Sequence, residues 1–411
     1  MRVRPVVYIV PLALLLLAIV GGSPLVMRLF FASLAVLAIG CTWAMLGLHG
    51  VKVSIGELPE HCQVGDRLDQ QITIENESKI PKLFLRAEQD TTFPGHEKVR
   101  LLNLSPGATR VWASDINCTR RGRYALGSVT LTAGDPFGVV TRRRSVGSTR
   151  NVIVYPRPVD LPYFRSSLSS LTDFGRSTAA RRISQIAPSA SGVREIMSGD
   201  SLEHIHWRST AHTGRLMVKV FDADRASEAG SKSAWVVLDM AATSALGAGD
   251  DSAEEYGVTI ATSVIKKYLD SGMRSGLTAV AEQDYTFPPD TAAAHLSEML
   301  EALAVMKAAG TTPVDELIGR NIGRLGGDAT VIIVTPQANE MLLDSVHRLK
   351  AYGASVVAVL LDAASFGGTI DPSYVAFSLG AAGAQVYVVH KGDNLARALD
   401  SRAAQWYSRF V

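Results

Sequence analysis

The stretch that decides the fold of the C-terminal half reads Ser233-Ala234-Trp235-Val236-Val237-Leu238-Asp239. An uninterrupted apolar run of this length, closed by an acid, is typical of a strand that is buried on both faces of a parallel sheet. Such a sheet needs helices on both sides, because each apolar face has to be covered. The stretch therefore predicts an α/β architecture.

Strands and helices alternate on the C-terminal side of this stretch. We expect helices at residues 253–269, 292–308, 341–352 and 395–407, and strands at residues 277–281, 330–335, 355–361 and 385–389. This order predicts a doubly wound parallel sheet with helices on both faces.

A dense polar segment, residues 193–224, precedes the strand. Asp200 is a favourable N-cap, and Glu203 follows it three residues later, as in a capping box. Gly214 suits the left-handed position that ends many helices. We therefore predict a short helix at residues 201–212, followed by a strand at residues 216–221.

On that helix His204, Arg208 and His212 are four residues apart and share one face. This basic stripe is the candidate partner-binding surface, and contact with an acidic group of the same domain is the alternative. His204 and His206 are two residues apart, so on a helix their imidazoles diverge, which argues against a zinc site.

A hydrolase that uses the segment from Asp200 to His212 is a second functional hypothesis. Ser209, His206 and Asp200 supply the residue types of a catalytic triad, but the sequence has no G-x-S-x-G nucleophile elbow. It also has no G-x-x-x-x-G-K phosphate-binding loop. We expect no catalysis and no cofactor.

Residues 51–156 show the period-2 alternation of strands. We expect strands at residues 51–55, 71–75, 83–86, 99–104, 109–116, 129–132 and 152–155, separated by turn residues. Short strands at this spacing predict a β-sandwich. Cys62 and Cys118 lie in this part and can pair in an oxidising compartment, although two cysteines are not a disulfide framework. The arginines 142–144 face either anionic lipid or solvent.

Two apolar runs, residues 6–20 and 29–48, open the chain on either side of a Gly-Gly-Ser-Pro turn. Each has about the length that spans a hydrocarbon core, roughly 17–25 residues, and together they predict a transmembrane helical hairpin. Arg2, Arg4 and Lys52 flank the hairpin, so the positive-inside rule predicts cytoplasmic soluble domains. A cleaved signal peptide at residues 1–22 is the alternative, and it would leave the second run as an anchor.

The charge balance of the 411-residue chain is nearly even, with 41 Lys and Arg against 39 Asp and Glu. A net charge of +2 gives no electrostatic basis for nucleic-acid binding.

The polar segment resembles the signature of the domain of unknown function 58 (DUF58) family. The matching pieces are Val193-Arg194-Glu195, Ser198-Gly199-Asp200, Ile205-His206-Trp207-Arg208-Ser209-Thr210-Ala211 and Gly214-Arg215-Leu216-Met217-Val218. The chain departs from the signature at Ile196, Glu203 and His212. The family has no established catalytic activity. Its members often occur beside MoxR-type AAA+ ATPases and transglutaminase-like membrane proteins, and the resemblance implies those partners.

In this family the α/β part resembles a von Willebrand factor type A domain, in which an Asp-x-Ser-x-Ser loop holds Mg²⁺. Here the loop is Asp239-Met240-Ala241-Ala242-Thr243, so the first hydroxyl is missing. Pro336 follows Thr335 where the second carboxylate of that fold is expected. Asp239 and Thr243 are therefore read as a degenerate remnant, and we expect no functional metal.

We expect four parts: a transmembrane hairpin at residues 1–50, a β-sandwich-like domain at 51–156, a linker or surface loop at 157–192, and the signature segment with the α/β domain at 193–411. The function expected is a membrane-tethered protein-interaction scaffold that contacts a protein partner and membrane lipid. If the hairpin is inverted, the chain is an envelope-side binding module instead.

Overall fold

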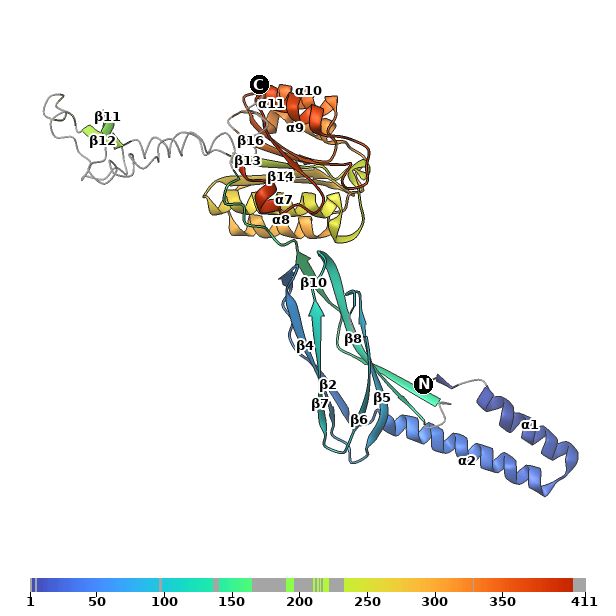
Figure 1. The fold of residues 1–411 in the computed structure, drawn as a ribbon. Coiled ribbons are helices and arrows are strands. Elements are labelled where there is room, and N and C mark those ends of the chain that lie inside the picture. Colours follow the sequence, from blue (N-terminus) through green and yellow to red (C-terminus); the bar gives the residue numbers. More distant parts are fainter. Residues whose placement is uncertain are drawn as a thin grey trace. The chain divides into compact units, whose positions relative to one another are not determined.

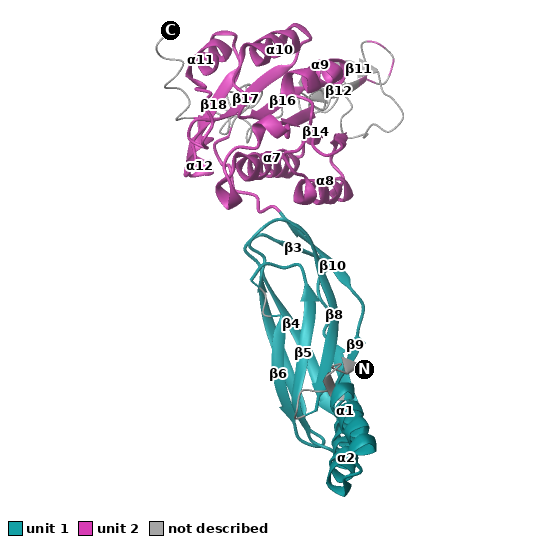
Figure 2. Cartoon of the chain, turned by 90° about the vertical axis from the view of Figure 1, so that its right-hand side faces the viewer, with its two compact units in different colours: residues 1–155 teal, residues 156–411 magenta. Residues whose placement is uncertain are grey.

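The computed structural model describes residues 2–3, 6–95, 98–135, 140–164, 190–195, 210, 213, 215, 217–221, 233–327 and 329–401. The chain divides into two compact units, Met1–Tyr155 and Pro156–Val411 (Figure 2). Each unit has its own hydrophobic core.

Two apolar helices, α1 (Val6–Gly21) and α2 (Pro24–Gly47), open unit 1 and pack against each other (Figure 1). Gly22, with a φ of 58°, supplies the left-handed backbone of the turn between them. Within the described residues α2 is the one helix that is long and apolar enough to cross a membrane. At 16 residues, or about 24 Å, α1 is shorter than a hydrocarbon core of about 30 Å.

The rest of unit 1 is a β-sandwich, as predicted. One sheet has the order β2-β4-β7, and the other has the order β1-β9-β8-β10-β3 with β5 and β6 attached through β8. The strands of the first sheet are β2 (Val51–Ile55), β4 (Arg67–Asn76) and β7 (Thr109–Asn117). Those of the second are β1 (Arg2–Val3), β3 (His61–Gln63), β5 (Lys82–Thr91), β6 (Val99–Leu104), β8 (Gly122–Gly134), β9 (Val140–Val146) and β10 (Arg150–Tyr155).

The sandwich core lies between the two sheets because one face of each strand is apolar. Strand β4 alternates exposed and buried residues along its length, and Ile72 and Ile74 face the core. They pack with Trp112 of β7 and with Leu85 and Leu131 of the other sheet. This alternation is the period-2 signal that the sequence carries.

Helix α2 ends against the second sheet. Lys82, only 2% exposed, donates a hydrogen bond to the carbonyl of Leu46 at 2.6 Å, and Arg142 donates to the carbonyl of Met45 at 3.2 Å. Burial lowers the pKa of the Lys82 ammonium. Cations on the last carbonyls of a helix satisfy groups that have no partner within the helix and complement its dipole. Helix α2 is therefore held against the sandwich by these side-chain hydrogen bonds as well as by the backbone connection to β2.

Unit 2 contains a six-stranded sheet with the order β15-β14-β13-β16-β17-β18. Every neighbouring pair is parallel except β14 and β15. The strands are β13 (Ser233–Leu238), β14 (Arg274–Val280), β15 (Asp284–Asp290), β16 (Thr330–Thr335), β17 (Ser355–Leu361) and β18 (Gln385–Val389). The parallel α/β sheet was predicted, and the antiparallel edge strand β15 was not, because Pro288 and Pro289 are uncommon in strands away from an edge.

Helices cover both faces of this sheet (Figure 2). On one face lie α7 (Ala253–Asp270) and α8 (Ala293–Val305), and on the other α9 (Val314–Leu325), α10 (Glu340–Ala351) and α11 (Ser373–Ala381). A short helix, α12 (Leu395–Ala398), follows β18. Side chains of β13 alternate between the two cores: Val236 packs in the first and Trp235 in the second.

The two described ends of residues 157–192, where a linker or surface loop was expected, contact other elements. Leu161 and Phe164 are buried in the first core of unit 2, and the backbone N–H of Val159 donates to Ser263 Oγ at 2.8 Å. Residues 190–192 belong to β11 (Ala190–Glu195), which pairs antiparallel with β12 (Met217–Phe221). These contacts could not be predicted from the sequence. The segment is rich in proline and serine, and two isolated apolar side chains produce no periodic pattern.

Candidate functional site

The candidate site lies where the strand order of the unit 2 sheet reverses. β13 is the first strand in the chain order of this sheet, and its neighbours β14 and β16 continue the sheet in opposite directions. The carboxyl ends of strands at such a reversal are where open α/β sheets bind ligands. Asp239 follows β13 at this edge, and Thr335 is the last residue of β16.

The Asp239 carboxylate is enclosed by hydrogen-bond donors of its own domain. Oδ2 accepts from Thr335 Oγ1 at 2.6 Å and from Ser244 Oγ at 2.8 Å, and Oδ1 accepts from the backbone N–H of Ala241 at 3.1 Å. The side chain is buried, with 6% exposed. Burial raises the pKa of this carboxyl, and the three hydrogen bonds oppose the rise.

A second carboxylate, that of Asp315, lies close enough to Asp239 to affect its pKa. Asp315, in the first turn of α9, adds a repulsive interaction that also raises the pKa of Asp239. The two acids reach the same edge because the loop before α9 is drawn against the loop after β13. Gly310 makes that approach possible: its N–H donates to Met240 O at 2.9 Å, and its carbonyl accepts from Ala242 N at 2.8 Å. A Cβ at Gly310 would lie 2.2 Å from Val280 O.

The hydroxyl of this loop that donates to Asp239 belongs to Ser244 and not to Thr243. Its side chain is exposed, and its backbone carbonyl accepts from Gln337 Nε2 at 2.8 Å. The 3₁₀ turn Ala242–Ser244 points Ser244 inward instead. Sequence reasoning missed Ser244 because the one-residue shift arises from the turn geometry. Thr335 was visible in the sequence as the end of a neighbouring parallel strand.

The remaining site predictions fall on residues that the structure does not describe. These are His204, Arg208 and His212 of the basic stripe, and Asp200, His206 and Ser209 of the triad hypothesis. Within the described residues, no group of three or more His, Cys, Asp or Glu side chains is arranged to hold a metal ion.

The two sandwich cysteines meet in the core of unit 1. Cys62 of β3 and Cys118, which follows β7, have their sulfur atoms 3.2 Å apart, and both side chains are buried. Burial is the largest cause of the raised pKa of both thiols. Both are free cysteines whose sulfur atoms are in contact.

Comparison with known proteins finds a family match over part of the chain. Residues 192–363 match the sequence profile of the family described as "Protein of unknown function DUF58". The chain is 22% identical to the uncharacterized protein YeaD of Bacillus subtilis strain 168 over 345 residues. This alignment covers 81% of each chain.

Similarity to solved structures is weak. The CARDB domain of PF1109 from Pyrococcus furiosus covers 26% of this chain and 94% of its own at 17% identity, with a TM-score of 0.19. Proximal thread matrix protein 1 of the mussel byssus covers 41% of this chain and 46% of its own at 18% identity, with a TM-score of 0.30.

Proposed function

The chain is a member of the DUF58 family, and we propose that it is a membrane-tethered scaffold that binds another protein through its α/β unit without catalysing a reaction. We propose a MoxR-type AAA+ ATPase as that partner and a transglutaminase-like membrane protein as a second one, in cell-envelope or assembly processes. These two partners come from the family resemblance.

The exposed face of α11 carries the protein-interaction part of the proposal. Its core face buries Val375, Ala376 and Leu379, as expected of a helix on a sheet. Its solvent face exposes Tyr374 (68%) and Phe377 (53%), which are three residues apart and therefore adjacent. A surface helix normally has a polar outer face, whereas exposed aromatic side chains are enriched at protein interfaces.

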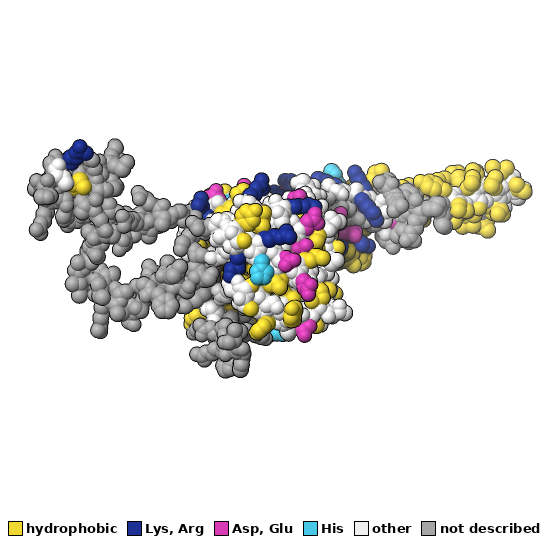
Figure 3. Space-filling model, turned by 90° about the horizontal axis from the view of Figure 1, so that it is seen from above, with side chains coloured by type: hydrophobic (Ala, Val, Ile, Leu, Met, Phe, Trp, Pro, Cys, Tyr) yellow, Lys and Arg dark blue, Asp and Glu magenta, His cyan; other side chains and the backbone are white. Residues whose placement is uncertain are grey.

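Charged and apolar side chains alternate over the face of unit 2 that Figure 3 shows, whereas the N-terminal helices are covered with hydrophobic side chains. Helix α2 has 24 residues, or about 36 Å, which is enough to cross a hydrocarbon core. The large apolar side chains of both helices, such as Ile19 and Leu25, are exposed. This surface supports membrane insertion.

The proposal includes a two-pass hairpin with both ends on one side of the membrane. Two contacts support it: β1, just before α1, pairs with Val140 and Thr141 of β9, and Arg142 of β9 bonds to the C-terminal end of α2. Both ends of the hairpin therefore meet at the same strand. The basic residues around these ends favour the cytoplasmic side.

We also propose that unit 2 is a von Willebrand factor type A-like domain. The support is the strand order, with one antiparallel edge strand, and the position of Asp239 at the reversal. Its Asp239 loop serves structure, because both carboxylate oxygens already accept hydrogen bonds from the protein.

The test is capture of a MoxR-type ATPase from the same organism with the full-length chain, solubilised in detergent. We expect the double variant Tyr374→Ser, Phe377→Ser to reduce capture at least tenfold, because exposed aromatic anchors dominate interface energies. Tyr352→Ser is the matched control, since Tyr352 is 58% exposed at the end of α10. Equal capture by the double variant and the control would refute α11 as the binding surface, and failure of all forms to capture the ATPase would refute this partner.

An envelope-side binding module is the second candidate, and the Cys62–Cys118 contact favours it. Two buried sulfur atoms in contact need little movement to form a disulfide, which persists in an oxidising compartment and not in the cytosol. The redox state of this pair in cells therefore distinguishes the two orientations.

A further inference from the structure

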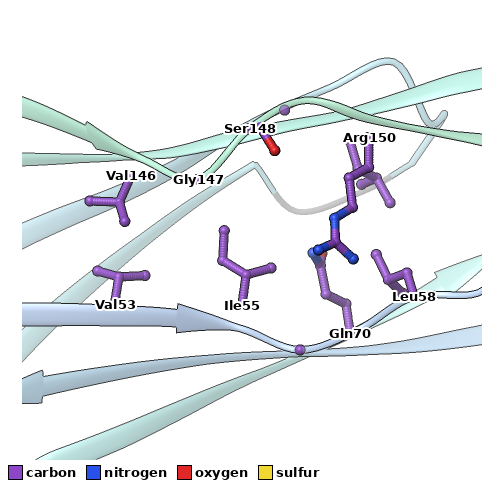
Figure 4. Close-up of a pocket in the computed structure, with 11 residues that line it drawn as sticks. Val53, Ile55, Leu58, Gln70, Val146, Gly147, Ser148 and Arg150 are labelled. Atoms are coloured by element: carbon purple, nitrogen blue, oxygen red, sulfur yellow. The ribbon is translucent and has the colours of Figure 1, made fainter.

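A small cavity opens between the two sheets of the unit 1 sandwich. It encloses about 220 Å³ and is bounded by β2 and β4 of one sheet and by β8 and the turn from β9 to β10 of the other. Figure 4 shows the side chains that point into it. Its volume is below the range of about 300–1,000 Å³ that is usual for sites of drug-sized ligands, so it suits a group the size of one or two amino-acid residues.

Gln70 of β4 places an unsatisfied amide in this cavity. The side chain is 2% exposed, and its Oε1 is buried without a hydrogen-bond partner. A buried polar atom without a partner is costly and uncommon, and it calls for an explanation. A primary amide offers an acceptor and a donor together, which matches the N–H and C=O of a peptide group.

Arg150, the first residue of β10, supplies a cation beside that amide. Figure 4 shows the guanidinium and the Gln70 amide at the same end of the cavity, and Ser148 directs its hydroxyl into the same space. Arg150 is exposed, and within the described residues its side chain makes no hydrogen bond or ion pair. A free guanidinium at the mouth of a small cavity is suited to a carboxylate, which it binds through two parallel hydrogen bonds.

The inner wall of the cavity is aliphatic. Val53, Ile55 and Leu58 line one side, and Leu126 and Val146 line the other. Gly147, with a φ of 91°, lets the turn after β9 approach β2: a Cβ there would lie 2.7 Å from Ile55 Cδ1. The aliphatic wall is therefore brought within reach of the amide and the guanidinium.

We propose that this cavity binds the C-terminal residue of a peptide or protein that ends in an aliphatic side chain. The terminal carboxylate pairs with Arg150, the last peptide group bonds with the Gln70 amide, and the side chain packs against Val53, Ile55 and Val146. A second hollow shares Leu58 and Arg150 with the cavity and is lined by both polar and apolar residues, which gives the preceding residues a path outward. This site lies in unit 1 and is independent of the interaction surface proposed on α11.

The test is fluorescence anisotropy with the full-length chain in lipid nanodiscs. The probe is a fluorescein-labelled Gly-Gly-Gly-Ala-Val peptide with a free carboxylate, and the same peptide with a C-terminal amide is the comparison. We expect saturable binding of the acid and binding about tenfold weaker for the amide, because a charge-assisted hydrogen bond is lost. Equal affinities, or no saturable binding of the acid at millimolar protein, would overturn the proposal.

Variants separate the two polar groups. Arg150→Gln is expected to weaken binding of the peptide acid about tenfold and to leave binding of the peptide amide unchanged. Gln70→Leu is expected to weaken both peptides while leaving the melting temperature equal or higher, since it removes an unsatisfied buried amide. Arg110→Gln, which changes an exposed arginine on β7, is the matched control and should bind normally. Unchanged binding in Arg150→Gln contradicts the assigned site.

A fatty acid shares the carboxylate and the apolar body but lacks the peptide group. Octanoate is therefore added as a competitor. We expect it to displace the peptide only at concentrations at least tenfold above those of unlabelled acetyl-Ala-Val. Equal competition by octanoate would overturn the assignment to a peptide terminus.

Discussion

Replacement of Asp239 is the sharpest test of the view that its loop is structural. Asp239→Ala removes the acceptor for two hydroxyl groups and one backbone N–H. Leaving a buried donor unsatisfied costs about 1–3 kcal/mol, and a hydroxyl can partly recover by rotating to another acceptor. We therefore expect a loss of about 3–5 kcal/mol in the free energy of unfolding of unit 2.

Asp239→Asn should behave differently. The amide oxygen still accepts a hydrogen bond, and the amide N–H₂ can donate to hydroxyls that also accept. The change also removes a buried charge. We expect a loss of about 1 kcal/mol or less. Thr243→Ala is the matched control in the same loop, and it should change stability by less than about 0.5 kcal/mol because its side chain is exposed.

The pH dependence has a definite sign. Burial raises the pKa of Asp239 above its ordinary value of 3.8, so the folded state binds a proton more tightly than the unfolded state. Stability contributed by the protonated form is therefore lost as the pH rises from about 4 through the raised pKa. Because asparagine does not titrate, the stability difference between Asp239→Asn and wild type should shift in favour of the variant as the pH rises over that range.

Differential scanning calorimetry of the full-length chain in detergent measures all three variants. The reasoning is refuted if Asp239→Ala melts like wild type, or if Asp239→Asn loses as much as Asp239→Ala. Calorimetric titration with Mg²⁺ adds a second check: we expect no binding at micromolar Mg²⁺, because both carboxylate oxygens already accept hydrogen bonds. A clear micromolar isotherm would contradict this interpretation.

Three further predictions concern the membrane end and the basic stripe of His204, Arg208 and His212. Lys82→Met should destabilise unit 1 by about 1–2 kcal/mol in a denaturant titration, because it removes the bond to the Leu46 carbonyl, whereas Lys79→Met, at an exposed position, should have no effect. A C-terminal alkaline phosphatase fusion should be inactive. Cys62 and Cys118 should react with alkylating agents once the protein is unfolded, and no reductant should be needed. An active fusion together with a Cys62–Cys118 disulfide would establish the envelope-side orientation. Arg208→Glu should leave the melting temperature nearly unchanged and weaken partner capture, and unfolding of this variant would instead identify a structural ion pair.

Periodicity was enough to predict much of this fold. The alternation in residues 71–75 placed β4, and the apolar run in residues 330–335 placed β16, because burial on one face or on both leaves a direct pattern in the sequence. Strand β9 gave no such signal. Its consecutive arginines are exposed, and it is a strand because β8 pairs with residues 141–146 and β1 pairs with its first two residues.

The residue types at the candidate site were also visible in the sequence, since an acid that ends a buried strand is a local feature. Amino-acid order alone placed Asp239 and Thr335 at strand ends. Whether Ser244 or Thr243 faces Asp239 depends on a single 3₁₀ turn, and the approach of Asp315 depends on Gly310 packing against Met240 and Val280. Likewise Gln70 reads as one more polar residue on an alternating strand, and Arg150 lies 80 positions later in the chain. Only the packing of the two sheets against each other brings that amide and that guanidinium to one cavity, and long-range packing has no local signature in the sequence.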